Sequence, residues 1–204
     1  MSNVEAARLR NPRGEGSRLR AEVVRAARRV LEVSGVEDAV TLRATAREAR
    51  VTAPALYGHF ANRGEIIEAV ISEAFAEFAA AVTDAMRGIA DPVERLRAGC
   101  GAYVRYAHEQ PATYRILFTR HQPSAVPRAA AQAAEVFQLL VDTIEECVAA
   151  GRSASRDPAA DAVVLWMALH GLAALPPSHP RFPWPEDHVL LDQVVNRSAL
   201  LNGG

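Results

Sequence analysis

The side chains best suited to chemistry lie close together between residues 41 and 63 of this 204-residue chain. They combine hydroxyl, imidazole and guanidinium groups at short intervals: Thr41, Arg43, Thr52, Tyr57, His59 and Arg63. Donors and cations of these kinds bind the phosphates of DNA, and an arginine fork also matches the edge of a guanine. The pattern therefore indicates DNA recognition.

Two short helices joined by a tight turn are expected to position these groups. Thr41 is suited to cap the first helix, whose inner side carries leucine and alanine at helical spacing. Residues 50–52 then form the turn, and Thr52 caps the second helix. This is the outline of a helix-turn-helix, with Tyr57 and His59 facing outward.

The expected DNA contacts divide between phosphates and base edges. The front of the second helix is expected to contact base edges, and it consists of Thr52, Ala53, Pro54 and Ala55. Because its alanines and proline offer no side-chain hydrogen bonds, Arg43 is the best candidate for reading a guanine. The expected phosphate contacts are Thr41, Tyr57, His59 and Arg63.

The same segment resembles the DNA-binding domain of TetR-type transcriptional repressors. The resemblance rests on T-L-R-x-x-A-x-x-A followed by V-T-x-x-x-L-Y-x-H-F, and it extends over residues 18 to 70. Arg50 departs from the family's customary turn glycine, Thr45 from its isoleucine and Arg63 from its lysine. The resemblance implies a homodimeric repressor that binds palindromic, double-stranded operator DNA and is released by a small-molecule effector.

Composition favours an all-α protein with a basic N-terminal end. Hydrophobic residues make up 50 % of the chain and aromatic residues 6 %, with abundant alanine, which favours helices over sheets. Residues 1–63 hold 12 arginines and 7 acidic residues, a net charge of +5, whereas residues 64–204 hold 11 and 17, a net charge of −6. The basic end is the expected nucleic-acid end.

The chain is expected to form three parts. They are a flexible arm over residues 1–16, a three-helix DNA-binding domain over 17–62, and a helical effector-binding and dimerisation domain over 63–204. Helices of the last part are expected to begin near residues 63, 91, 111, 128 and 158, before a proline-stiffened loop over 175–185 and a final helix.

The sequence gives only weak signals for a membrane span or a cysteine metal site. The longest apolar stretch, residues 162–175, is interrupted by His170 and is shorter than the ~20 residues of a membrane span. Cys100 and Cys147 lack metal-ligand spacing and are expected to be reduced, buried packing residues. A cytoplasmic protein without a membrane partner is expected.

The helix expected over residues 158–175 is apolar nearly all the way round. One face carries Leu165, Leu169 and Leu172, and the other carries Val163, Trp166, Met167, His170 and Ala174. Two apolar faces need two partners, so one of them is expected to contact a second subunit. The expected dimer interface is Leu165, Leu169, Leu172, Leu190 and Val194, although the pattern leaves open which face is used.

A second resemblance points to the effector. W-M-A-L-H-G-L resembles the W-x-x-x-H-G signature of one TetR subfamily, and P-A-T-Y-R-I-L-F resembles its P-x-x-Y-R-x-x-F segment. The few ionisable groups nearby indicate a mostly apolar effector. The candidate effector-binding residues are Tyr103, Tyr106, Phe118, Phe137, Trp166 and His170, and the alternative for each is a place in the core.

An enzyme is the alternative class. The sequence has no nucleophile elbow, glycine-rich phosphate loop or closely spaced pair of metal-binding histidines, so no catalytic residue, metal or cofactor is expected. His108, His121 and His170 could instead converge on a metal or haem within a helical bundle.

Overall fold

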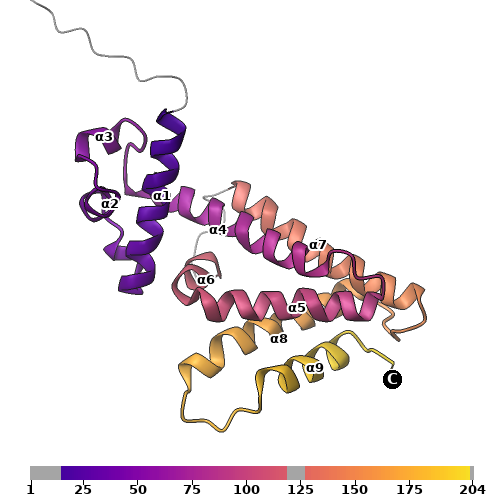
Figure 1. The fold of residues 1–204 in the computed structure, drawn as a ribbon. Helices are drawn as coiled ribbons and strands as arrows, with labels where there is room; N and C mark the ends of the chain where they lie inside the picture. The colour runs from indigo at the N-terminus through magenta and orange to yellow at the C-terminus, as the bar shows by residue number, and fades with distance from the viewer. Residues whose placement is uncertain (1–14, 119–126, 203–204) are drawn as a thin grey trace, which may run out of the picture. The chain divides into compact units, whose positions relative to one another are not determined.

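The computed structural model describes residues 15–118 and 127–202, and the arm expected over residues 1–14 lies outside them. Over the described residues the chain forms nine α-helices and one short 3-10 turn, η1 (Figure 1), which confirms the all-α prediction. Two compact units divide between Val70 and Ile71, inside helix α4 (Arg63–Met86).

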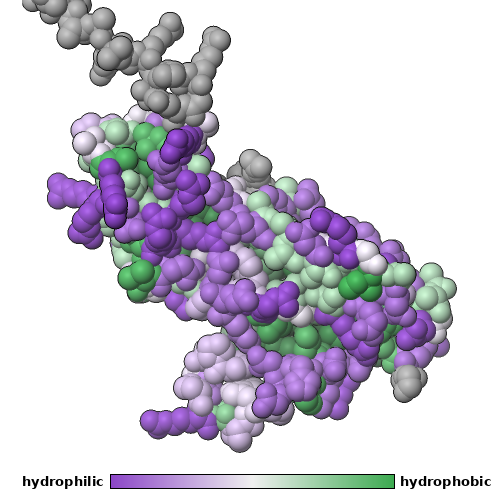
Figure 2. Space-filling model, viewed as in Figure 1, coloured by the Kyte–Doolittle hydropathy of each residue, from purple (hydrophilic) through white to green (hydrophobic). Residues whose placement is uncertain are grey.

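The first unit surrounds a small apolar core. It contains α1 (Glu15–Ser34), η1 (Glu37–Ala39), α2 (Leu42–Ala49), α3 (Ala53–Tyr57) and the first residues of α4. Its fully enclosed side chains include Val23, Val24, Leu31, Val40, Leu56, Phe60, Ile66 and Ile67. On the face drawn in Figure 2, hydrophilic side chains cover much of this unit.

Local signals in the sequence place the ends of these helices. The Thr41 hydroxyl accepts a hydrogen bond from Ala44 N at 3.1 Å, and the Thr52 hydroxyl accepts one from Ala55 N at 3.4 Å, so both predicted N-caps are confirmed. Gly35 ends α1 in the left-handed conformation, with φ of 72°.

The second unit is a larger bundle. It contains the rest of α4 with α5 (Pro92–Glu109), α6 (Pro111–Phe118), α7 (Pro127–Ala149), α8 (Pro158–Ser178) and α9 (Asp187–Ser198). Helix α5 lies centrally, since it contacts α6, α7, α8 and α9. The predicted start of α5 is confirmed, because the Asp91 carboxylate accepts from Val93 N at 2.9 Å and Glu94 N at 3.0 Å.

Helix α8 runs further than the sequence indicated. Pro176 and Pro177, predicted to open a loop, lie in its last turn. Two hydrogen bonds close this last turn: the Ser178 hydroxyl donates to Ala174 O at 2.7 Å, and His179 N donates to Leu175 O at 2.9 Å.

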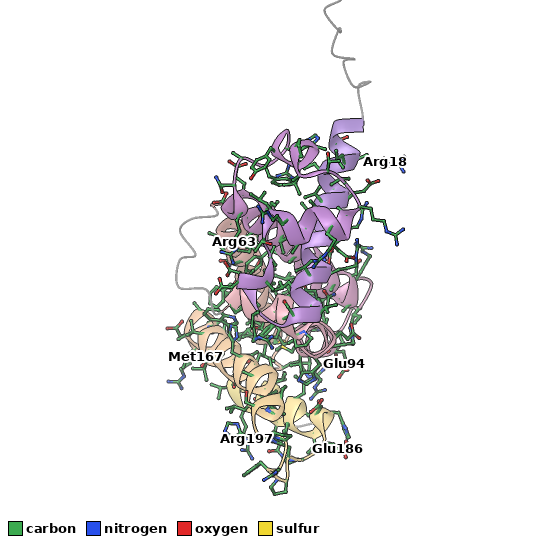
Figure 3. All side chains as sticks on the ribbon, turned by 90° about the vertical axis from the view of Figure 1, so that its left-hand side faces the viewer. Arg18, Arg63, Glu94, Met167, Glu186 and Arg197 are labelled. Atoms are coloured by element: carbon green, nitrogen blue, oxygen red, sulfur yellow. The ribbon has the colours of Figure 1, made fainter. Side chains whose placement is uncertain are left out.

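The two faces of α8 differ sharply in burial. Leu165 and Leu169, which we expected at the subunit interface, are 0 % and 2 % exposed because they pack inside their own subunit. Val164 and Met167 are instead 53 % and 65 % exposed, and Figure 3 shows Met167 at the outer edge of α8. Leu172, Leu190 and Val194 are half-buried.

Helix α8 also meets the length and hydropathy criteria of a membrane span. Its mean hydropathy is 1.5 over 18 residues, and 22 % of this stretch is buried in the subunit. The core helix of a soluble protein can meet the same criteria, so they do not by themselves indicate a membrane span. Helix α8 nevertheless exposes a large apolar area, and such an area is usually covered by another surface.

Candidate DNA-binding surface and effector cavity

The helix-turn-helix leaves hydrogen-bond donors free at its two caps. Thr41 and Thr52 use an oxygen lone pair to accept from the backbone, which leaves each hydroxyl hydrogen available to a phosphate or a base. Both side chains are exposed, as are Arg43, Pro54 and Tyr57. Ala53, Ala55 and His59 are half-buried. The predicted contact residues therefore lie at or near the surface of one small unit.

The turn between α2 and α3 takes the left-handed conformation at Arg50. Its φ is 57° and its ψ 37°, a region that costs a residue with a Cβ atom more than glycine. Two backbone bonds hold this turn: Val51 N donates to Ala46 O at 3.0 Å, and Arg50 N to Arg47 O at 3.2 Å. The turn forms without the customary glycine.

Thr45 is the second departure from the family pattern, and it is fully buried. Its hydroxyl oxygen has no hydrogen-bond partner. An unpaired buried hydroxyl costs stability, so we expect Thr45 to stabilise the core of the first unit less than the family's isoleucine would.

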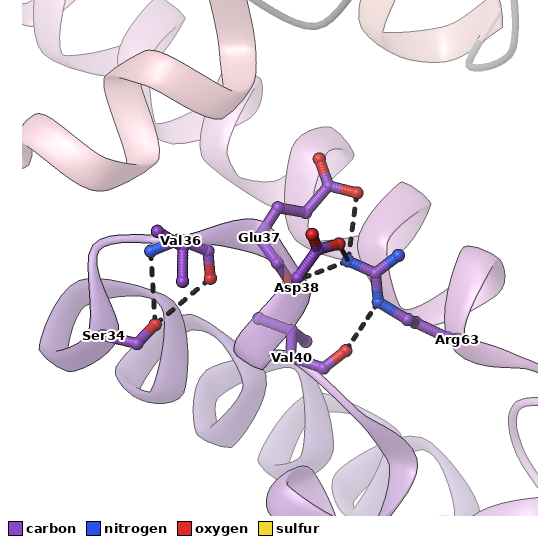
Figure 4. Close-up of polar contacts among 6 residues, drawn as sticks. All are labelled: Ser34, Val36, Glu37, Asp38, Val40 and Arg63. Carbon is purple, nitrogen blue, oxygen red and sulfur yellow. Dashed lines mark hydrogen bonds and ion pairs between the residues drawn. The ribbon is translucent and has the colours of Figure 1, made fainter.

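Arg63 lies at the start of α4 and binds the segment that precedes α2 (Figure 4). Its Nε donates to Val40 O at 2.9 Å, and its Nη2 donates to Glu37 O at 2.7 Å. Nη2 also lies 3.4 Å from a Glu37 carboxylate oxygen and 3.2 Å from an Asp38 carboxylate oxygen. The guanidinium that we expected to hold a phosphate is thus engaged within the protein.

The second unit encloses an apolar cavity of about 430 Å³. Four of the predicted effector residues line it: Tyr103, Phe118, Phe137 and Trp166. Among the described residues that line the cavity, none carries a charge. Such a lining suits an uncharged, mostly apolar group.

Aromatic rings crowd one end of the cavity. The Phe118 ring centroid lies 5.6 Å from that of Phe75, 5.7 Å from Phe78 and 5.9 Å from Tyr103. The Phe137 ring lies 5.9 Å from Trp166. The Phe118 contacts with Phe75 and Phe78 and the Phe137 contact with Trp166 are edge-to-face, and the contact with Tyr103 is tilted.

Three polar groups meet behind these rings. The Tyr114 hydroxyl lies 2.6 Å from Nδ1 of His170, and the Tyr103 hydroxyl lies 3.1 Å from the ring nitrogens of His170. The two hydroxyls are 3.2 Å apart. Each of the three groups therefore has hydrogen-bond partners inside the cluster.

The cluster is uncharged near neutral pH. Burial raises the pKa of Tyr114 to about 12, and burial with the neighbouring Tyr114 raises the pKa of Tyr103 far above its ordinary value. Burial lowers the pKa of His170 below 6.5. The predicted residue His170 thus contacts the cavity wall through Phe118 and Trp166 without itself lining the cavity.

Two predicted effector residues, Tyr106 and His170, do not line the cavity. The Tyr106 hydroxyl instead donates to Ala74 O at 3.2 Å. Tyr114, which was not predicted, joins the polar cluster behind the cavity wall. Helix α4 was also missed as a wall, and it contributes Phe75, Phe78, Val82 and Met86.

The histidines of the alternative reading have separate partners. His108 Nδ1 lies 3.4 Å from an Asp187 carboxylate oxygen, His170 belongs to the tyrosine cluster, and His121 lies outside the described residues. Within residues 15–118 and 127–202, no three histidine, cysteine or acidic side chains are placed to hold a metal. Both cysteines are free and buried, as predicted.

An exposed helix-turn-helix in one unit and an enclosed apolar cavity in the other define a DNA-binding regulatory protein. Family models match both parts. Residues 23–70 match the model for bacterial regulatory proteins of the tetR family, and residues 96–197 match the tetracyclin repressor-like C-terminal domain. The chain therefore belongs to the TetR family of transcriptional regulators.

Individual proteins are similar to this chain in sequence or in fold. The HTH-type transcriptional activator FasR of Mycolicibacterium smegmatis is 27 % identical over 158 residues, which cover 78 % of this chain and 67 % of FasR. A protein of unknown function from Rhodococcus sp. RHA1 has a TM-score of 0.80 at 26 % identity, over 93 % of this chain and 97 % of that one. AibR, solved with isovaleryl coenzyme A and operator DNA, has a TM-score of 0.66 at 20 % identity, over 88 % and 97 %.

Proposed function

We propose that this protein is a cytoplasmic, homodimeric repressor that binds palindromic operator DNA and is released by a small, mostly apolar effector. The observation that carries the proposal is the combination, in one chain, of an exposed helix-turn-helix and an uncharged cavity of about 430 Å³. The structure of AibR with an acyl coenzyme A and operator DNA supports the same combination of ligands.

The proposed reader uses the exposed donors of α2 and α3. Thr41, Tyr57 and His59 hold phosphates, and Arg43 reads a guanine. Thr52, Ala53, Pro54 and Ala55 present the front of α3, where methyl contacts and DNA shape contribute. Arg63 takes a different role from the one expected: it fixes the backbone before Thr41 and so positions α2.

The proposed dimer forms through the exposed faces of α8 and α9. Two readers must be held about 34–36 Å apart, one helical turn of DNA, to reach successive half-sites. Val164 and Met167 on α8 offer the apolar surface for this contact, together with the half-buried Leu172, Leu190 and Val194. The buried Leu165 and Leu169 support this face from inside.

The proposed effector site is the cavity of the second unit. Release of DNA requires that the effector bind one conformation better than another, and a tenfold loss of operator affinity needs ~1.4 kcal/mol of such preference. The relative FasR is named an activator. A promoter-reporter assay with and without the protein therefore tests whether this chain represses or activates transcription.

The effector proposal is tested through Trp166, which lines the cavity. Once a releasing compound is found, Trp166→Ala should respond more weakly to it while binding operator DNA normally without it. The half-buried Trp184 lies outside the cavity lining, so Trp184→Ala is the matched control. An equal response of wild type and Trp166→Ala would refute the effector site.

A further inference from the structure

We infer that the cavity of the second unit binds a single, straight hydrocarbon chain whose polar head stays at the opening between α7 and α8. The inference deepens the proposed effector role and rests on it.

The cavity is longer in one direction than in the others. Its lining on α4 extends from Phe75 to Met86, and on α7 from Ala133 to Thr143. At about 1.5 Å per residue these stretches measure roughly 16 Å and 15 Å. The lining on α5, from Leu96 to Tyr103, and on α8, from Val163 to Leu169, measures only about 10 Å and about 9 Å. The cavity is therefore longest along α4 and α7, and we call this long axis the tunnel.

The inner end of the tunnel is aliphatic. Met86 and Leu96 line it. Gly99 makes room for the Met86 side chain, because a Cβ atom at position 99 would lie 2.9 Å from Met86 Sδ. Thr143 also lines the cavity, but its hydroxyl donates to Leu139 O at 2.6 Å and needs no ligand atom. This end accepts methyl and methylene groups.

The aromatic end offers no unpaired polar group either. The Tyr103 hydroxyl, the polar atom nearest this end, is already bonded to Tyr114 and His170. A charged or strongly polar ligand group placed beside it would lose its hydration without gaining a partner. The enclosed part of the ligand is therefore hydrocarbon along the whole tunnel.

The opening lies between α7 and α8. Val163 and Trp166 line the cavity and are still 41 % and 39 % exposed, and Ala134 on α7 is exposed as well. These are the lining residues at which a ligand can reach solvent. A polar head at this position keeps its water, while the chain extends inward toward Met86 and Leu96.

Tryptophan fluorescence can measure directly whether the cavity binds straight hydrocarbon chains. In a Trp184→Phe background, Trp166 is the remaining tryptophan of the chain, so its emission reports on the cavity. Straight-chain primary alcohols from butanol to dodecanol should bind about fourfold more tightly per added methylene until the tunnel is full. Decanol should bind more tightly than 1-adamantanol, which has the same number of carbons in a compact cage.

The position of the head is tested with decanoate. If the head lies at the opening, decanoate should bind within about tenfold of decanol, because its carboxylate remains hydrated. A loss of about a thousandfold or more would place the head inside and overturn the orientation. If binding did not depend on the length of the alcohol, or if adamantanol bound more tightly than decanol, the proposal of a straight hydrocarbon ligand would be wrong.

Two variants shorten the tunnel from its inner end. Leu96→Phe should move the chain length of tightest binding to shorter alcohols, and Leu96→Met, which keeps the volume, should not. If Leu96→Phe does not fold, Val82→Phe serves the same purpose on α4. If Leu96→Phe or Val82→Phe folds and the alcohol length of tightest binding stays the same, the hydrocarbon does not extend toward Met86 and Leu96 as proposed.

Operator binding separates this inference from the proposed function. If straight alcohols follow the length rule but never alter operator binding, the chain-binding site stands and the effector role fails. If a compact compound releases operator DNA and straight chains neither bind nor release, the effector role stands and this inference fails.

Discussion

Nε of Arg63 donates a hydrogen bond of 2.9 Å to the carbonyl of Val40, the residue before the Thr41 cap of α2. Nη2 of the same guanidinium binds the Glu37 carbonyl at 2.7 Å. The two bonds join the first turn of α4 to the backbone that leads into the reader. We therefore propose that Arg63 positions the reader.

Replacing Arg63 tests this positioning role. Arg63→Lys keeps the charge, but one ammonium does not reproduce the fork that meets both carbonyls. We expect the variant to lose about 1–3 kcal/mol of unfolding free energy and to bind operator DNA more weakly at every salt concentration. Urea unfolding and binding titrations at several salt concentrations provide the measurements.

The salt dependence separates positioning from phosphate contact. Loss of one phosphate contact lowers the slope of log K against log salt by about 0.9, whereas a positioning residue leaves that slope unchanged. We therefore expect Arg63→Ala to retain the wild-type slope. A slope reduced by about one unit in Arg63→Ala would show that Arg63 holds a phosphate after all.

Arg43 is expected to set sequence preference at one base pair of each half-site. Arg43→Ala should remove about 1–3 kcal/mol of discrimination there and leave the other positions unchanged. Tyr57→Phe is the control, because loss of a phosphate contact weakens binding to all sequences alike. Binding measured against single-base variants of the operator decides, and unaltered preferences in Arg43→Ala would exclude this role.

The sequence predicted what depends on local chemistry. The caps Thr41, Thr52 and Asp91 each bind a backbone N–H two or three residues away, so their role is visible in a short window. The contact of Arg63 with Val40 spans 23 residues, and that of Tyr114 with His170 spans 56. Pairs so distant carry no periodic signal, and the sequence did not indicate them.

The faces of α8 show a second limit. A helix that is apolar nearly all round has no preferred side in its own pattern, so the face of Leu165 and the face of Met167 looked equally suited to either partner. Packing against the rest of the second unit decides, and it buries Leu165 while leaving Met167 exposed. The cavity was predictable as apolar, but its α4 wall depends on tertiary packing.

The proposed dimer is tested by adding charge to the exposed face of α8. Val164→Glu with Met167→Glu should yield a folded monomer in sedimentation, because two carboxylates would be buried without partners. Val33→Glu, at a valine of α1 that is 90 % exposed, is the matched control. A doubly substituted protein that sediments as a dimer would exclude this interface.

His170 gives the second unit a pH dependence of known sign. Burial lowers the pKa of His170 below 6.5, so the unfolded chain takes up a proton at higher pH than the folded one. The unfolding free energy should therefore fall as the pH drops below about 6.5 and level off below the folded pKa. Above that window both forms are neutral, and His170 adds no pH dependence.

The effect is measured by urea unfolding between about pH 7.5 and about pH 5.5. His170→Asn should flatten the dependence, and the same change at the exposed His188 should not. A dependence that persists fully in folded His170→Asn would assign the effect to another group.

Selection of bound duplexes from a random DNA pool tests the central claim most directly. We expect enrichment of one two-fold symmetric sequence, with half-site centres about 10 base pairs apart and bound by one dimer. A strong preference for a guanine contacted by Arg43 should appear at the same place in both halves. Enrichment of a sequence without symmetry, or of none, would contradict the account of a dimeric operator-binding regulator.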